Sequence, residues 1–170
     1  MPECDKTPDL MELYLFRHGI AEDGHANQPD HLRSLIPEGE RRLRKILERA
    51  AAAQVSPSLI LSSPFLRAKQ TAALANEMLP GKRETLLTDT LTPMARPDEV
   101  WQEVRAHRAE TSILLASHEP LMSQLTAYLL QCPALRLDFK KGMLVRIDFD
   151  SMGATPVGTL RWILTSSLAS

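Results

Sequence analysis

The sequence predicts an α/β protein, a three-layer α/β/α sandwich with a mostly parallel central sheet. Three short apolar runs, at 13–16, 59–61 and 112–116, are typical of strands buried on both faces. Segments with helical features separate these runs, and strands that are joined by helices pair in parallel. The ends of all three strands are therefore expected at one edge of the sheet, where open α/β sheets bind their ligands.

Proline and acidic residues mark the start of the first predicted helix, which runs from Pro37 to about Ala53. One face carries apolar side chains at helical spacing, namely Leu43, Ile46, Leu47 and Ala50. The arginines and the lysine of this helix lie mostly off that stripe and indicate a solvated face, with a docking surface for an acidic partner as the alternative. The preceding stretch, 22–34, has the composition of a loop.

The second predicted helix runs from Pro64 to about Met78, with Ser63 as its N-cap and Phe65 on its core face. A short strand is predicted at 84–87. Two more helices that begin at proline are predicted at 97–109 and 120–130. Two final strands, at 143–149 and 159–164, are predicted to form a hairpin.

Length and composition limit the class of protein. The 170 residues correspond to one domain, expected over 11–170 after a flexible tail at 1–10. A net charge of -1 argues against nucleic acid as a partner, because nucleic-acid binders carry a basic excess. Cys4 and Cys132 have no CxxC spacing and are read as reduced thiols. With no signal-like segment and no apolar run near ~18 residues, we expect a cytoplasmic protein without membrane association.

Chemically active residues follow each of the three strands. Arg17 and His18 end the first, and Gly19 then allows a sharp turn and close approach of a ligand. Arg67 falls in the first turn of the helix after the second strand, where it can join the free backbone N–H groups in binding a phosphate or carboxylate. His118 follows the third strand. Two arginines and two histidines are therefore expected to converge.

This set of side chains fits phosphoryl transfer. Guanidinium groups bind phosphoryl oxygens bidentately, a neutral imidazole can attack phosphorus, and a second, protonated imidazole can donate to the developing charge. An ion pair near Glu77 is the alternative for Arg67, although a helix start is an unfavourable place for a cation. No Walker-type loop is present, and His25, His31 and Asp30 lack metal-ligand spacing, so neither a cofactor nor a metal is expected.

Three segments, 15–19, 63–71 and 117–118, resemble in order and separation the signatures of the histidine phosphatase superfamily, whose fold is phosphoglycerate mutase-like. The Ser-Pro-x-x-Arg-Ala-x-Gln-Thr block that begins at Ser63, the Leu-Thr-Pro stretch at 91–93 and the short chain without a large inserted cap resemble in particular the SixA-type phosphohistidine phosphatases. The resemblance covers about residues 11 to 165.

The resemblance implies a role for each residue of the set. His18 would be the nucleophile and become phosphorylated, while Arg17 and Arg67 would clamp the phosphoryl oxygens. His118 would hydrogen-bond the same group and stabilise charge in the transition state.

Arg33 and Gly19 are expected as further substrate contacts. Arg33 lies in a segment, 30–39, that resembles the family's Arg-x-Leu-Thr-x-x-Gly stretch, although Ile36 stands where threonine is usual. Larger members of the family protonate the leaving oxygen with a carboxylic acid, for which Asp89 and Glu119 are the candidates here. The alternative for Glu119 is a role at a helix start. A phosphohistidine substrate relaxes the need for an acid, because an imidazole leaves more easily than an alkoxide.

The expected function is therefore hydrolysis of a phosphorylated histidine on a protein, a phosphotransfer domain of a signalling relay, through a covalent phosphohistidine enzyme intermediate. Two alternatives stay open at this point. One is a phosphatase of small phosphate esters. The other is a phosphate-dependent binding module without turnover, against which the presence of both histidines argues.

Overall fold

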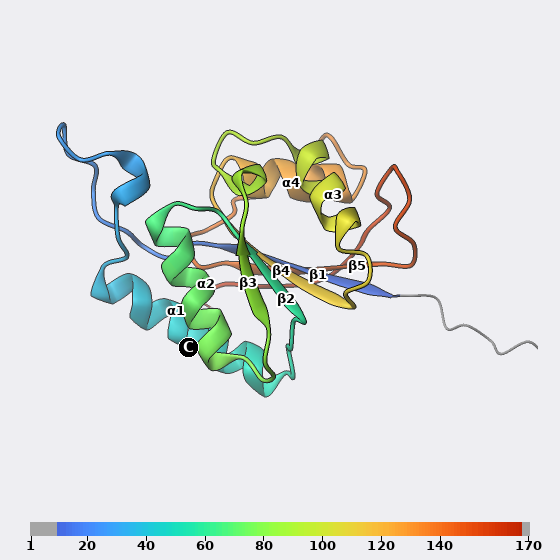
Figure 1. Ribbon diagram of the computed structural model, residues 1–170, viewed down its shortest axis with the longest axis horizontal. Helices are drawn as coiled ribbons and strands as arrows, with labels where there is room; N and C mark the ends of the chain where they lie inside the picture. Colours follow the sequence, from blue (N-terminus) through green and yellow to red (C-terminus); the bar gives the residue numbers. More distant parts are fainter. Residues whose placement is uncertain (1–9, 168–170) are drawn as a thin grey trace, which may run out of the picture.

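The structure is a computed structural model that describes residues 10–167, and its elements form three layers (Figure 1). A six-stranded sheet in the order β3-β2-β4-β1-β5-β6 forms the middle layer. Helices α1 and α2 cover one face, and α3 and α4 cover the other. The elements are β1 (Met11–Arg17), η1 (Asp30–Leu32), α1 (Pro37–Ala52), β2 (Leu59–Ser62), α2 (Leu66–Met78), β3 (Glu84–Leu87), η2 (Asp89–Leu91), α3 (Pro97–Ala106), β4 (Ser112–Ser117), α4 (Leu121–Leu129), β5 (Leu144–Phe149) and β6 (Thr159–Leu164).

The strand directions agree with the sequence-based prediction. Strands β3, β2, β4 and β1 run parallel to one another, so their carboxyl ends share one edge of the sheet. The last two strands form an antiparallel hairpin, and β5 pairs antiparallel with β1. The predicted fold class, an α/β/α sandwich with a mostly parallel sheet, is confirmed.

Two apolar cores, one on each face of the sheet, explain why β1 has no polar alternation. Leu13 and Leu15 pack into the core under α3 and α4, whereas Tyr14 and Phe16 pack into the core under α1 and α2. A strand that is covered on both faces needs apolar side chains at successive positions. The predicted stripe of α1 is fully buried in the second core: Leu43, Ile46, Leu47 and Ala50.

The start of α2 differs from the prediction. The helix begins at Leu66 with Phe65 as its N-cap, so Ser63 is not the cap and Pro64 is not the first helical residue. The residue before a proline disfavours helical backbone, and Ser63, the first residue after β2, still pairs with the neighbouring strand, since its N–H donates to the Ala116 carbonyl at 3.0 Å. Phe65 is half-buried and packs on His118, not in the core.

Smaller differences concern α3, the loop at 22–34 and the cysteines. Helix α3 ends at Ala106, because the residues after it form a turn in which Glu110 N–H donates to the His107 carbonyl. The loop contains one short helical turn, η1. Cys132 is a free, exposed thiol, whereas Cys4 and the predicted tail, apart from Leu10, lie outside the described residues. Within 10–167, no helix is long and apolar enough to cross a membrane.

Candidate active site

The structure places His18 and His118 side by side at the carboxyl edge of the sheet. Arg17 of β1 is in register with Ser117 of β4, so each histidine is the first residue beyond its strand. The two imidazole rings have their centroids 5.0 Å apart, and the side chains are buried, with 6% and 1% of their surface exposed. Parallel pairing thus brings together two residues that are a hundred positions apart in the chain.

The hydrogen bonds of His18 place its proton on the inner ring nitrogen and leave the outer one, Nε2, unprotonated. Nδ1 lies 2.7 Å from the Gly19 carbonyl, which can only accept, so Nδ1 carries the proton and Nε2 carries the lone pair. Nε2 faces the Nε–H donor of Arg67 at 3.3 Å. Burial, together with the positive charges of Arg67 and Arg17, lowers the pKa of His18 to about 3 against the opposing effect of the Gly19 hydrogen bond. His18 is therefore a neutral imidazole at physiological pH.

Ser63 orients the second imidazole, a role that the sequence-based prediction missed. The His118 Nε2 lies 2.8 Å from Ser63 Oγ, which also accepts the backbone N–H of Phe65. When the Ser63 hydroxyl donates its hydrogen bond to Nε2, the imidazole of His118 carries its own proton on Nδ1. That Nδ1 is buried and has no hydrogen-bond partner among residues 10–167.

Burial also determines the charge of His118. Desolvation, reinforced by the charge of Arg67, lowers the pKa of His118 well below its ordinary value. This favours a neutral imidazole that donates through Nδ1–H, in place of the protonated second imidazole that the sequence analysis favoured.

Arg67 is in the first turn of α2 and its side chain is only 4% exposed. Besides facing His18, its guanidinium donates through Nη1 to the Asp30 carbonyl at 2.7 Å and through Nη2 to the Asp30 carboxylate at 2.9 Å. The alternative, an ion pair of Arg67 near Glu77, is not found: Glu77 pairs with Arg44 at 3.2 Å. The phenyl ring of Phe65 covers the guanidinium, with 5.2 Å between Arg67 Cζ and the ring centroid.

Arg17 approaches the histidines from β1. Its Nη1 donates to the Phe139 carbonyl, and its buried Nε has no partner within the described part of the chain. Desolvation lowers the pKa of Arg17, and the charges of Glu119 and Asp138 oppose this shift. A guanidinium starts from so high a pKa that Arg17 stays charged at neutral pH.

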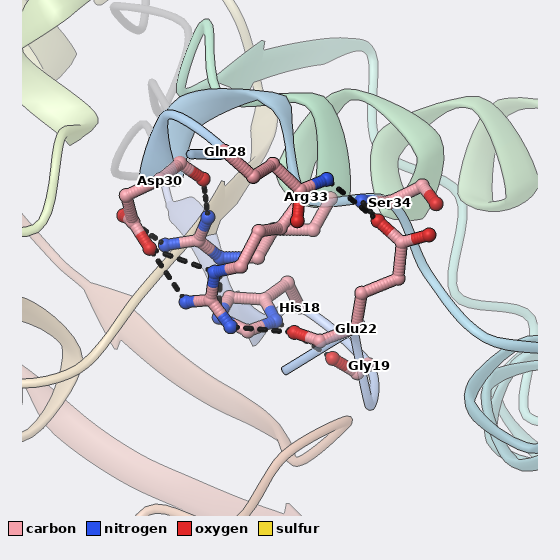
Figure 2. A network of polar contacts seen from close by, with 8 residues as sticks. His18, Gly19, Glu22, Gln28, Asp30, Arg33 and Ser34 are labelled. Atoms are coloured by element: carbon pink, nitrogen blue, oxygen red, sulfur yellow. Dashed lines mark hydrogen bonds and ion pairs between the residues drawn. The ribbon is translucent and has the colours of Figure 1, made fainter. Parts of the chain in front are cut away.

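Arg33 reaches the site through Asp30 (Figure 2). Its Nε donates to the Asp30 carboxylate at 2.8 Å, and its Nη1 donates to the Glu22 carbonyl at 2.7 Å. Asp30, which the sequence analysis considered only as a metal ligand, therefore lies between two of the predicted phosphate-binding arginines. No spacing or periodic pattern in the sequence predicts that Asp30 contacts these two arginines.

Gly19 and Gly39 allow the loop after β1 to pack tightly on α1. A Cβ on Gly19 would lie 2.8 Å from a side-chain carbon of Leu43, and one on Gly39 would lie 2.1 Å from the Ile20 carbonyl oxygen. The Gly19 N–H donates to Thr71 Oγ1 at 3.4 Å, so Gly19 shapes the backbone of the site.

Ile36, which stands where the family usually has threonine, is the N-cap of α1. Its side chain accepts no hydrogen bond from the helix, which makes the helix less stable by about 1 kcal/mol than a threonine cap would.

Within residues 10–167, no hydrogen bond or ion pair joins the carboxylate of either candidate acid to the ring of His18 or His118. Glu119 accepts hydrogen bonds from the backbone N–H of Ser123 at 2.7 Å and from its hydroxyl at 2.8 Å, so it caps the first turn of α4. Asp89 begins η2 and is exposed. In the described part of the chain, no three His, Cys, Asp or Glu side chains gather in a way that would hold a metal ion.

Comparisons with known proteins agree with this geometry. The sequence pattern of the histidine phosphatase superfamily (branch 1) matches residues 13–94. Phosphohistidine phosphatase SixA of Escherichia coli (strain K12) is 31% identical over 157 residues, which cover 89% of this chain and 92% of that protein. The chain belongs to the histidine phosphatase superfamily.

Two further comparisons cover different shares of this histidine phosphatase. An uncharacterized protein of Picosynechococcus sp. (strain ATCC 27264 / PCC 7002 / PR-6) is 44% identical over 64 residues, 38% of this chain and 39% of that protein. A solved structure of the protein histidine phosphatase SixA complexed with tungstate superimposes with a TM-score of 0.81 at 27% identity, covering 92% of this chain and 98% of that chain. The similarity supports a histidine-phosphatase-type hydrolase.

The lowered pKa of the paired histidines predicts that acid destabilises this histidine phosphatase. Between its ordinary pKa of 6.5 and about 3, the unfolded chain binds a proton at His18 that the folded chain does not. Stability is therefore lost as the pH falls below about 6.5, by about 2 kcal/mol for His18 alone on reaching about pH 5.

Urea unfolding across this pH range measures the effect. His18→Asn and His118→Asn should each flatten the dependence of the unfolding free energy on pH, whereas His25→Asn, in the exposed part of the loop, should leave it unchanged. An equally steep dependence in the His18 variant would contradict the assigned protonation state.

Proposed function

We propose that this histidine phosphatase acts in the cytoplasm and removes phosphate from a phosphorylated histidine on a signalling protein, a phosphotransfer domain, through a covalent intermediate on His18. The observation that carries the proposal is the protonation pattern of His18. Its proton is held on Nδ1 by the Gly19 carbonyl, and its Nε2 lone pair points to the Arg67 guanidinium beside His118.

The reaction follows from these atoms in two steps. The Nε2 lone pair of His18 attacks phosphorus, and the bond from phosphorus to the substrate imidazole breaks, with its electron pair going to the leaving nitrogen, which takes up a proton from bulk water. Water then attacks the phosphorus on His18 and gives up one proton to the solvent, and the bond to Nε2 breaks with its electron pair returning to Nε2, which releases inorganic phosphate. In both steps Arg17 and Arg67 hold the non-bridging oxygens, and His118 donates to one of them through Nδ1–H.

The state of the candidate acids supports a phosphohistidine substrate over an ester. An alkoxide leaving group needs a proton from a positioned acid, but the Glu119 carboxylate is used in capping α4 and Asp89 is exposed. An imidazole is a better leaving group, so it requires less of the enzyme.

Exposed apolar side chains near the site support a substrate carried by a protein. Leu32, in η1 two residues after Asp30, is 50% exposed, and Met94, which follows η2 at the carboxyl edge of the sheet, is 83% exposed. These two side chains are the contacts that we assign to a protein substrate.

Rapid quench of the enzyme with radiolabelled phosphohistidine protein tests the intermediate. The wild type should yield a phosphoenzyme that is labile in acid and stable in base, and mass spectrometry should place the label on His18. His18→Ala should lower turnover at least about a thousandfold, because the nucleophile is lost, while circular dichroism stays unchanged.

His25→Ala is the matched control and should retain wild-type turnover. Wild-type rates in His18→Ala, or a label on another residue, would contradict the assigned nucleophile. Faster phosphate release from small O-phosphate esters than from phosphohistidine would contradict the proposed substrate.

Changing the apolar docking residues tests the protein substrate. Leu32→Ser and Met94→Ser should raise KM for a phosphohistidine protein about three- to tenfold, since each removes apolar contact area, and should leave the hydrolysis of free phosphohistidine unchanged. Val157→Ser is the control, because Val157 is 74% exposed in the β5–β6 connection at the opposite edge of the sheet. Equal KM values for the protein substrate in all variants would contradict docking at this surface.

A further inference from the structure

One carboxylate connects two of the guanidinium groups at the site. Asp30 Oδ1 accepts from Arg33 Nε at 2.8 Å and from Arg33 Nη2 at 2.6 Å, while Oδ2 accepts from Arg67 Nη2 at 2.9 Å. The Asp30 carbonyl accepts from Arg67 Nη1 at 2.7 Å. Figure 2 shows Asp30 facing Arg33, with His18 nearby.

These contacts determine which side of the Arg67 guanidinium faces His18. Asp30 binds the two terminal nitrogens, whereas Nε–H, on the side edge of the planar group, points to His18 Nε2. Three of the five N–H donors of Arg67 are thereby used by Asp30 and His18, and two are left for phosphoryl oxygens. A guanidinium free to rotate would not present this edge to the nucleophile.

We propose that Asp30 is a positioning residue for phosphate binding, which aligns Arg67 against His18 and attaches Arg33 to the same site. The proposal rests on the proposed function, because it assumes that the aligned arginines bind a phosphoryl group. Asp30 acts through the arginines and does not itself touch the substrate.

The charge of Asp30 suits this role and does not suit a general acid. Desolvation raises the pKa of the Asp30 carboxyl, but the hydrogen bonds and charges of Arg67 and Arg33 outweigh it, so the pKa is lowered overall. A carboxylate that stays ionised has no proton to donate. It also offsets the repulsion between two neighbouring cations, which would otherwise oppose their convergence.

The loop before α1 holds Asp30 in place. The Glu22 carboxylate accepts the backbone N–H of Ser34 at 3.1 Å and the side-chain amide of Gln28 at 3.0 Å, which ties the two ends of the loop together (Figure 2). The His31 ring packs edge-on against Phe65, with centroids 6.1 Å apart. Asp30 is thus fixed against the start of α2, although its side chain is 55% exposed.

Calorimetric titration with tungstate, a phosphate-like oxyanion, tests the proposal without requiring turnover. Asp30→Ala and the isosteric Asp30→Asn should bind tungstate about 10- to 100-fold more weakly than the wild type, because a misplaced binding group can cost this much. Asp30→Asn should still unfold in one cooperative transition well above the temperature of the titration, which separates the loss of positioning from a loss of the fold. Asp23→Asn, an exposed carboxylate in the same loop, should have wild-type affinity.

Arg33 provides a second readout. Arg33→Ala should weaken tungstate binding in the wild type and should have little further effect in Asp30→Asn, because Arg33 is aligned by Asp30. Additive losses would overturn the proposal.

Two other outcomes in the titration are also decisive. Unchanged or tighter binding by the Asp30 variants would overturn the positioning role, and tighter binding would show that the carboxylate competes with the anion for Arg67. Failure of the wild type to bind tungstate at all would instead overturn the proposed function, and the positioning role with it.

Discussion

The register of β1 against β4 is the constraint on which the candidate site depends. Because Arg17 pairs with Ser117, His18 and His118 leave the sheet at the same level and their rings meet. A slip of one residue would turn one strand over and exchange its two faces. Leu13 and Tyr14 pack into opposite cores, so such a slip would disrupt both. The free energy gained by burying apolar side chains in the two cores therefore maintains the geometry of the site.

Charge balance at this edge follows from burial. Desolvation and nearby guanidinium groups keep both imidazoles neutral, so one can offer a lone pair and the other an N–H. The arginines concentrate positive charge where a phosphoryl group would carry negative charge. Asp30 partly offsets that charge, and Ser63 Oγ lies within hydrogen-bond distance of His118 Nε2. In the proposed mechanism the imidazoles are the reacting and donating groups, and the residues around them set their protonation state.

The sequence was most informative where local pattern and burial coincide. Continuous apolar runs predicted β1, β2 and β4, and the parallel order of the strands predicted that Arg17, His18, Arg67 and His118 would approach one another. The role of Asp30 could not be predicted, because its partner Arg67 lies in another segment, 37 positions along the chain, and the loop has no periodicity. The start of α2 was misplaced because two rules competed: proline favours the first helical turn, but it also keeps the preceding Ser63 extended, and pairing with Ala116 decided the outcome.

A crystal structure of the enzyme with orthovanadate tests the central claim most directly, because vanadate can adopt the five-coordinate geometry of phosphoryl transfer. The account predicts vanadium bonded to His18 Nε2, with its equatorial oxygens contacted by Arg17, Arg67 and His118 Nδ1. Vanadate bound elsewhere, or bound at this edge with His18 turned away from it, would contradict the account.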